Sequence, residues 1–358
     1  MKSQLIASGL KLLLATACTT SLYTDISSDS QRITIVKQDT IYTFSTLTAN
    51  QSVSPQSDKF YTWYLRNNIA YSQGGYEGRL LHGSYTKMLR DNTLLEKGAY
   101  REGLKDGTWT RWHTNGKIKT VRQWKQGDAR GSQETFTSQG TLQETQHFRS
   151  GQLHGKETRY MLSPDSSVPV RQTRTWKNNQ LTGPFVIYDT LEQIYQQGSY
   201  RQGKLHGKVV THNRYVESEQ QEKVITQLTT YQDGKLHGKF KERFPDGHIR
   251  RTGKYRYGKL HGKIISYELT PSSEGGNQAH YSKRVYRWKN QQRHGAFREY
   301  NSDGTLSKRG SYRDGKLHGK LIRWDEEDNK IIQYYQDGEL IKTPLKRSDS
   351  KSTSEVEQ

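Results

Sequence analysis

The chain has 358 residues, of which 30% are hydrophobic and 26% are charged. This is little aliphatic material for a closely packed double-layer core, whereas 23 Tyr, 7 Trp, 8 Phe and 32 Gly favour strands and turns over helix bundles. The net charge of +20 favours contact with phosphates, lipid head groups or acidic proteins, and the single cysteine excludes an intramolecular disulfide or a cysteine-based metal cluster.

Residues 1–18 resemble a bacterial lipoprotein signal, because an apolar run from Leu12 to Leu14 and then small residues precede Cys18. The resemblance implies that Cys18 is the lipidated N-terminus and that the protein is an outer-membrane lipoprotein in the cell envelope of a Gram-negative bacterium. A lipid anchor is expected rather than a transmembrane helix, since no other segment approaches the roughly 20 apolar residues that cross a bilayer. A cytoplasmic location is the alternative, because Lys11 interrupts the apolar stretch.

The next segment, residues 19–56, is rich in Ser, Thr and Gln and is predicted to be a polar tether with weak strands at Ile33–Val36 and Ile41–Phe44. A capping hairpin is expected over Phe60–Tyr71. It opens a repeat array predicted for residues 57–342, and residues 343–358 are predicted to be a disordered tail.

The array is defined by one glycine that recurs mostly every 24 residues, with a few longer steps. It is the second glycine of the motif GKLHGK or of a variant of this motif. The aligned glycines are Gly83, Gly107, Gly131, Gly155, Gly183, Gly207, Gly238, Gly262, Gly295 and Gly319. An aromatic residue stands seven positions before every one of them, from Tyr76 to Tyr312.

Two turn signals fall in each period, separated by short runs rich in Tyr, Trp, Ile and Thr. This pattern predicts two strands per repeat and an all-β fold, an elongated single-layer antiparallel β-meander of about ten 24-residue hairpins. The distance from the aromatic to the aligned glycine never changes, so the extra residues near 164, 217 and 270 must lie at the other turn. We therefore expect one sheet edge of fixed length and one extendable edge.

The pattern Tyr-x-x-Gly-Lys-Leu-His-Gly-Lys resembles the MORN repeat variant of bacteria, which includes proteins labelled YwqK-family antitoxins, and it extends over roughly residues 60–342. The resemblance implies an extended β-sheet used for protein or membrane contact. The antitoxin label implies an inhibitor of a cytoplasmic toxin, which we keep as the alternative function. The regular pattern is broken at Asn290–Arg293, where the first glycine is missing.

A histidine precedes the aligned glycine in seven repeats, for example His206 and His237. Neighbouring copies are expected about 10 Å apart, too far for two imidazoles to share a metal ion. Asp106, Arg130 and Thr182 occupy the same position elsewhere. A turn-capping hydrogen bond fits these residue types better than a metal site, so neither a metal nor a cofactor is expected.

Paired lysines flank the fixed turn in four later repeats and are the candidate residues for binding an anion or a partner. They are Lys204, Lys208, Lys235, Lys239, Lys259, Lys263, Lys316 and Lys320. They form a basic edge that favours anionic lipid head groups or an acidic protein partner, although lysines at a sheet edge also serve to block aggregation.

No nucleophile elbow, phosphate-binding loop, HExxH or paired-cysteine motif is present, so the chain is not expected to be an enzyme. Nucleic acid is not the expected partner either, because the aromatics recur where a stacked array needs them for its own packing. The sequence thus predicts a non-enzymatic binding or scaffold lipoprotein.

Overall fold

The structure is a computed structural model that describes residues 30–48, 50–163, 166–218, 221–270, 280–325 and 327–342. Every regular element among them is a β-strand, and all the strand pairs are antiparallel. The all-β meander expected from the repeat is therefore confirmed. The chain divides into two compact units, residues 1–128 and 129–358.

Unit 1 begins with strands that the repeat pattern does not contain. Residues 30–47 of the segment predicted as a tether form two full strands, and the second pairs with the first strand of the array, so they belong to the sheet. The hairpin expected near Phe60 is present and turns at Arg66 and Asn67. The strands are β1 (Ser30–Lys37), β2 (Thr40–Leu47), β3 (Phe60–Leu65), β4 (Asn68–Gln73), β5 (Arg79–Leu89), β6 (Leu94–Arg101), β7 (Leu104–Trp112) and β8 (Ile118–Lys125).

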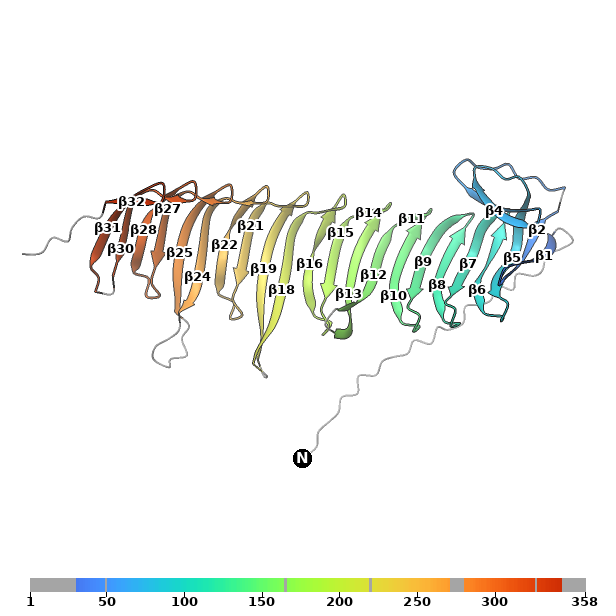
Figure 1. Ribbon diagram of the computed structural model, residues 1–358, viewed down its shortest axis with the longest axis horizontal. Coiled ribbons are helices and arrows are strands. Elements are labelled where there is room, and N and C mark those ends of the chain that lie inside the picture. Colours follow the sequence, from blue (N-terminus) through green and yellow to red (C-terminus); the bar gives the residue numbers. More distant parts are fainter. Residues whose placement is uncertain are drawn as a thin grey trace, which may run out of the picture. The chain divides into compact units, whose positions relative to one another are not determined.

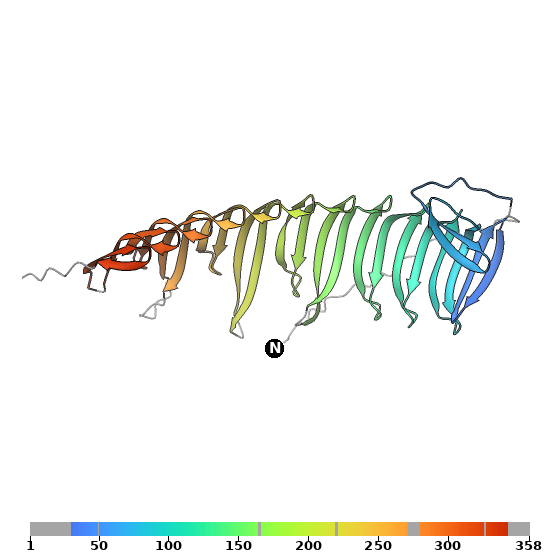
Figure 2. The same ribbon diagram turned by 45° about the horizontal axis from the view of Figure 1, so that its top comes forward.

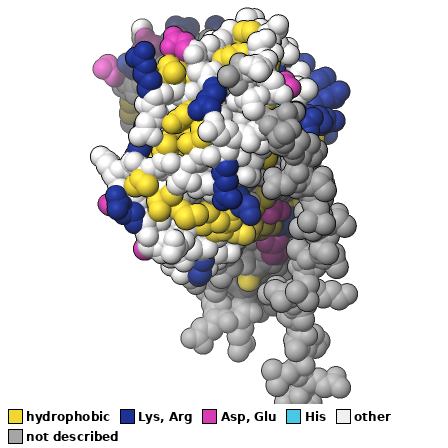
Figure 3. All heavy atoms as spheres, turned by 90° about the vertical axis from the view of Figure 1, so that its right-hand side faces the viewer, with side chains coloured by type: hydrophobic (Ala, Val, Ile, Leu, Met, Phe, Trp, Pro, Cys, Tyr) yellow, Lys and Arg dark blue, Asp and Glu magenta, His cyan; other side chains and the backbone are white. Residues whose placement is uncertain are grey.

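The core of unit 1 forms where the β3–β4 hairpin joins β5. Its largest cluster of buried side chains is made by Ile35, Phe44, Leu81, Tyr85, Tyr100 and Trp109. Some large apolar side chains of β1, β3 and β4 stay exposed, among them Phe60 and Tyr71. Figure 3, which looks at this end, shows apolar patches between Lys and Arg side chains.

Unit 2 is a run of hairpins placed side by side (Figure 1). Its long strands are β9 (Asp128–Phe136), β10 (Leu142–Arg149), β12 (Gly155–Ser163), β13 (Ser166–Lys177), β15 (Gly183–Tyr188), β16 (Ile194–Arg201), β18 (Gly207–Ser218), β19 (Gln221–Gln232), β21 (Gly238–Arg243), β22 (Ile249–Arg256), β24 (Gly262–Thr270), β25 (His280–Lys289), β27 (Gly295–Tyr300), β28 (Leu306–Arg313), β30 (Gly319–Trp324) and β31 (Lys330–Gln336). A two-residue strand follows each pair of long strands: β11 (Gln152–Leu153), β14 (Gln180–Leu181), β17 (Lys204–Leu205), β20 (Lys235–Leu236), β23 (Lys259–Leu260), β26 (Gln292–Arg293) and β29 (Lys316–Leu317), and β32 (Glu339–Lys342) ends the unit.

The fixed edge, which we call the turn edge, is built from two-residue turns. Gln202 and Gly203 both have positive φ, 50° and 75°, between the paired residues Arg201 and Lys204. Two positive φ values define the type I′ turn that suits the twist of a hairpin. The aligned glycine then follows the short strand, and all ten copies have φ between 65° and 102°. The short strands consequently run at a steep angle to the long ones (Figure 2).

The extendable edge absorbs the longer repeats by lengthening strands. In the repeat with the second insertion, β18 and β19 remain paired out to Ser218 and Gln221. In the third, β24 and β25 remain paired out to Thr270 and His280. Part of each insertion therefore becomes a longer two-stranded arm.

One face of the sheet in unit 2, which we call the aromatic face, carries the core. Phe185, Val209, Phe240, Ile264, Phe297 and Leu321 occupy equivalent positions two residues after the aligned glycine, and each is at most 4% exposed. The repeating tyrosine of the next repeat packs on this column, as Tyr255 does on Phe240 with ring centroids 5.0 Å apart. Because side chains alternate along a strand, the residues between these positions point to the opposite side, the outer face.

Candidate anion-binding face

The structure places the eight predicted lysines in two rows of unit 2, and all eight are exposed. Lys204, Lys235, Lys259 and Lys316 begin the short strands of the turn edge. Lys208, Lys239, Lys263 and Lys320 each follow the aligned glycine and precede a buried core residue, so they lie on the outer face. Cys18, the predicted lipidation site, lies outside the described residues.

The turn edge is held together by hydrogen bonds between successive turns. The N–H of Gly203 donates to the carbonyl of Leu181 (2.9 Å), and that of Gly234 donates to the carbonyl of Leu205 (2.9 Å). The positions of the lysines on this edge are therefore set by backbone geometry, since each turn is tied to the preceding one.

The histidine column takes part in the same connections between turns. Nδ1 of His318 accepts the N–H of Asp337 (3.4 Å), and Oδ1 of Asp106 accepts the N–H of Gln126 (3.1 Å) at the equivalent position in unit 1. The turn-capping interpretation is thus confirmed at these positions. Among the described residues, no group of three or more His, Cys, Asp or Glu side chains is arranged to hold a metal ion.

Further cations, which the sequence pattern did not predict as binding residues, share the outer face with these lysines. Lys239 stands directly opposite Lys254 on the neighbouring strand, and Lys263 stands directly opposite Arg287. A third like-charged pair is Arg298 and Arg309. We call the following residues the basic face: Lys239, Lys241, Arg243, Lys254, Lys263, Lys283, Arg287, Arg298 and Arg309.

No acidic residue interrupts the basic face. The outward positions of the described strands from β21 to β28 contain neither Asp nor Glu. None of the nine cations forms an ion pair with a described residue. Like charges directly opposite each other destabilise a sheet by several tenths of a kcal/mol per pair. Fold stability therefore does not explain why three such pairs lie together.

The carboxylates of the same strands lie on the aromatic face. Glu268 pairs there with Arg284, with Oε2 and Nη2 2.6 Å apart, and Glu299 accepts a hydrogen bond from the Tyr286 hydroxyl. The two sides of β21–β28 thus differ in charge. The alternating cations Lys239, Lys241 and Arg243 indicate in the sequence that one face of this strand is basic. The cations that lie opposite them on neighbouring strands depend on the register of strand pairing.

Apolar and aromatic side chains are interspersed with the cations. Lys283 stands opposite Tyr267 on one side and Tyr300 on the other, and its Nζ lies 5.4 Å from the centre of the Tyr300 ring. Ile265 and Val285 are paired on the same face. Within the described residues, no helix has the length and apolar character to cross a bilayer.

Comparison with known proteins gives one family match. No curated protein matches the chain. The model of the MORN repeat variant matches residues 105–126, which correspond to the β7–β8 hairpin and nearly one 24-residue period. The chain is thus a repeat protein that contains a MORN-type repeat within a β-meander.

Proposed function

We propose that this chain is a non-enzymatic binding protein whose basic face and turn-edge lysines contact an anionic membrane surface. The observation that supports the proposal is the set of nine outer-face cations without a carboxylate partner among the described residues. Each lysine or arginine near a surface of anionic lipid is worth about 1 kcal/mol, and the contribution is screened by salt.

The composition of the outer face favours a bilayer over a compact acidic protein. Tyr267, Tyr300 and Trp324 stand at equivalent positions near the extendable edge. The pair Ile265 and Val285 lies between the pair Tyr267 and Lys283 and the pair Lys263 and Arg287. Tyrosine and tryptophan are enriched at the level of lipid head groups, where lysine and arginine extend their charged ends into water. A sheet face with this mixture matches a head-group layer in chemistry.

The membrane proposal is tested by sedimentation with vesicles of phosphatidylcholine alone or mixed with phosphatidylglycerol. We expect binding only to the anionic vesicles, with weaker binding at physiological salt than at low salt. The triple variant Lys239→Glu, Lys263→Glu, Arg287→Glu removes three exposed cations and is expected to lose that binding. Its matched control, Lys119→Glu, Lys125→Glu, Lys177→Glu, makes the same charge change at exposed residues elsewhere. Equal binding by the two variants would count against the basic face.

We further propose that Cys18 carries a lipid anchor and that the protein resides in the bacterial envelope. The support is the lipoprotein-like signal in residues 1–18. Metabolic labelling with palmitate is expected to mark the wild type and not Cys18→Ser. An unlabelled, cytosolic wild type would overturn the anchor and favour the inhibitor alternative, while leaving the vesicle experiment to decide the basic face.

A further inference from the structure

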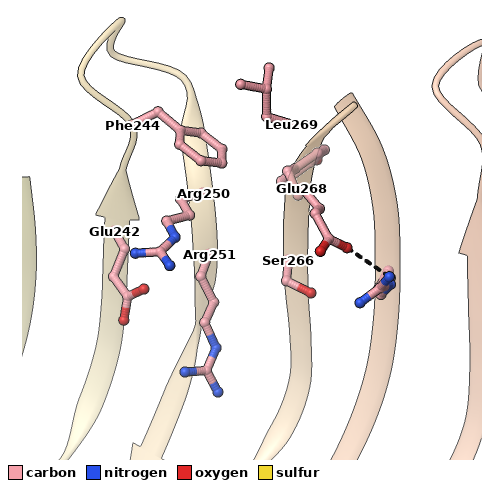
Figure 4. A pocket seen from close by; sticks show the side chains of 9 residues that line it. Glu242, Phe244, Arg250, Arg251, Ser266, Glu268 and Leu269 are labelled. Carbon is pink, nitrogen blue, oxygen red and sulfur yellow. Dashed lines mark ion pairs between the residues drawn. The ribbon is translucent and has the colours of Figure 1, made fainter. Parts of the chain in front are cut away.

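A cavity of about 350 Å³ opens between β21, β22, β24 and β25, near the extendable edge of unit 2. Figure 4 shows its side chains, with the Glu268–Arg284 ion pair on one side and Phe244 and Leu269 at the outer end. Glu242, Arg251, Ser266 and Arg284 form one cross-strand row, on the same face as Phe240 and Ile264. This charged row therefore lies on the aromatic face, and Tyr267 and Leu269, which alternate with it along β24, complete the lining at the extendable edge.

A β-bulge brings two arginines into this cavity. Glu242 pairs with Arg251 and Arg243 pairs with Ile249, which leaves Arg250 as the extra residue. A bulge re-aims side chains, and here Arg250 and Arg251 both line the cavity. In the other described hairpins with the same bulge, the extra residues are Leu95, Lys119, Gln143, Tyr195 and Ser307. The adjacent pair of arginines is thus particular to this hairpin.

The charges of the cavity leave one positive charge in excess. Three guanidinium groups, of Arg250, Arg251 and Arg284, face the two carboxylates of Glu242 and Glu268. Arg284 is neutralised by Glu268 at 2.6 Å. Arg251 and Glu242 stand directly opposite each other, but no ion pair between described residues joins them. The guanidinium of Arg251 instead lies 5.4 Å from the centre of the Phe240 ring. Its planar set of N–H donors is therefore available to a carboxylate.

The outer end of the cavity is apolar and held in place. The Phe244 ring packs against the Tyr281 ring with centroids 5.2 Å apart, and the Tyr281 hydroxyl hydrogen-bonds Asp246. Leu269 is 55% exposed beside it. The cavity thus combines a cationic inner wall with an apolar rim, which suits a ligand with an anionic head and an apolar chain.

We infer that this cavity binds a monocarboxylate with an apolar chain, with its head on Arg250 and Arg251 and its chain against Phe244 and Leu269. A single negative charge balances the single excess positive charge. A phosphate monoester carries up to two charges near neutral pH, so it would leave the cavity with a net negative charge. Because none of the nine basic-face residues lines the cavity, this inference stands independently of the proposed membrane contact.

The inference is tested by isothermal titration calorimetry of the full chain with octanoate, acetate, octyl phosphate and octyl glucoside. Octanoate is expected to bind at one site, and the other three compounds are expected to bind more weakly. Arg250→Gln, Arg251→Gln removes the head-group contacts and is expected to weaken octanoate by at least about tenfold. Leu269→Ala is expected to reduce the preference for octanoate over acetate.

The control is the triple variant of Lys239, Lys263 and Arg287, which is expected to bind octanoate like the wild type while failing on anionic vesicles. The arginine double variant is expected to behave in the opposite way. Octanoate affinity unchanged in the arginine variant, equal affinity for octyl glucoside, or tighter binding of octyl phosphate would each overturn the assignment. Circular dichroism of each variant shows whether the fold is retained, and Arg251→Lys provides a second, milder change.

Discussion

The carboxylate of Glu157 accepts a charge-assisted hydrogen bond from Nε of Arg174, with Nε and Oε2 2.7 Å apart, at the core position that Phe185 occupies in the next repeat. Glu157 is only 1% exposed, and it also accepts hydrogen bonds from Gln146 (3.0 Å) and the Trp176 indole (3.0 Å). A polar network thus replaces the ring that packs this column elsewhere in unit 2.

Replacing Glu157 by Ala is expected to destabilise unit 2 strongly, by about 3–5 kcal/mol if Arg174 remains buried without its partner. Arg174 retains 18% exposure, which lets water screen its charge and places the expected cost at the lower end of that range. Urea unfolding followed by tryptophan fluorescence measures the difference. Glu157→Gln retains the shape and part of the hydrogen bonding and is expected to cost less. If Glu157→Gln were as stable as the wild type, the charge would have no part in the network.

The same carboxyl predicts a dependence of stability on pH. Burial by itself raises the pKa of Glu157, but hydrogen bonds from Gln146 and Trp176, together with Arg174, outweigh it and hold the pKa below its ordinary value. The stabilisation is therefore complete above the ordinary glutamate pKa of about 4.3 and is lost as the pH falls through the lower pKa of the folded state. Urea midpoints measured from neutral to strongly acidic pH are expected to fall less steeply in Glu157→Gln than in the wild type. Parallel curves would contradict this.

Gly98→Ala is expected to destabilise unit 1 by about 1–3 kcal/mol through overpacking. A methyl group on Gly98 would lie 2.3 Å from two ring atoms of Trp109, and that ring is 3% exposed and fixed by a hydrogen bond to the Ala99 carbonyl. Gly75→Ala is the control, since no atom lies within 4 Å of the added methyl. Thermal unfolding of both variants checks the expectation, which fails if Gly75→Ala lowers the midpoint as much.

Asp106→Ala is expected to release the amide of Gln126 at the turn edge. The lost hydrogen bond is worth about 1 kcal/mol, so exchange of that amide is expected to accelerate about fivefold. The neighbouring Gly127 amide donates to the Lys105 carbonyl at 2.9 Å and serves as the internal reference in an NMR hydrogen-exchange measurement. Asp106→Asn retains an acceptor and is expected to protect Gln126. Equal acceleration of both amides would point to general destabilisation instead.

Gln291 adopts φ 75° where most repeats have glycine, and its Oε1 accepts the N–H of Leu260 at 2.9 Å. Gln291→Ala keeps the unfavourable φ and loses this hydrogen bond, whereas Gln291→Gly loses the hydrogen bond but relieves the φ. The alanine variant is therefore expected to be less stable than the glycine variant by about 1–2 kcal/mol. Differential scanning calorimetry ranks the two, and a reversed order would show that φ is not the limiting factor.

The period and the turns could be predicted from the sequence because they are local. Gly203 and Gln202 form the expected tight turn, and Asn179, which stands where most repeats have this glycine, has φ 62°. At Gln291 and Asn179 a side-chain hydrogen bond offsets the unfavourable positive φ, and no local rule predicts that hydrogen bond. Each of these side chains caps a leucine N–H in the previous repeat, Leu260 and Leu153 respectively.

The basic face and the cavity could not be predicted because they depend on register between distant residues. Lys263 and Arg287 are 24 positions apart, and only the pairing of β24 with β25 places them opposite each other. The bulge at Arg250 shifts the pairing by one residue, which a strict alternation pattern does not foresee. Within residues 19–56 the sequence predicts only weak strands at Ile33–Val36 and Ile41–Phe44, because this segment lacks the repeat motif and nothing local indicates that β2 pairs with β5.

The hydrogen bonds between turns allow the number of repeats to change during evolution. In unit 2 every turn of the Gly203 type offers the same donor to one side and the same acceptor to the other. Duplicating or deleting one whole period therefore leaves all donors and acceptors matched. The number of cations presented to a surface can then change in discrete steps, and with it the avidity of the contact, without any new residue having to arise.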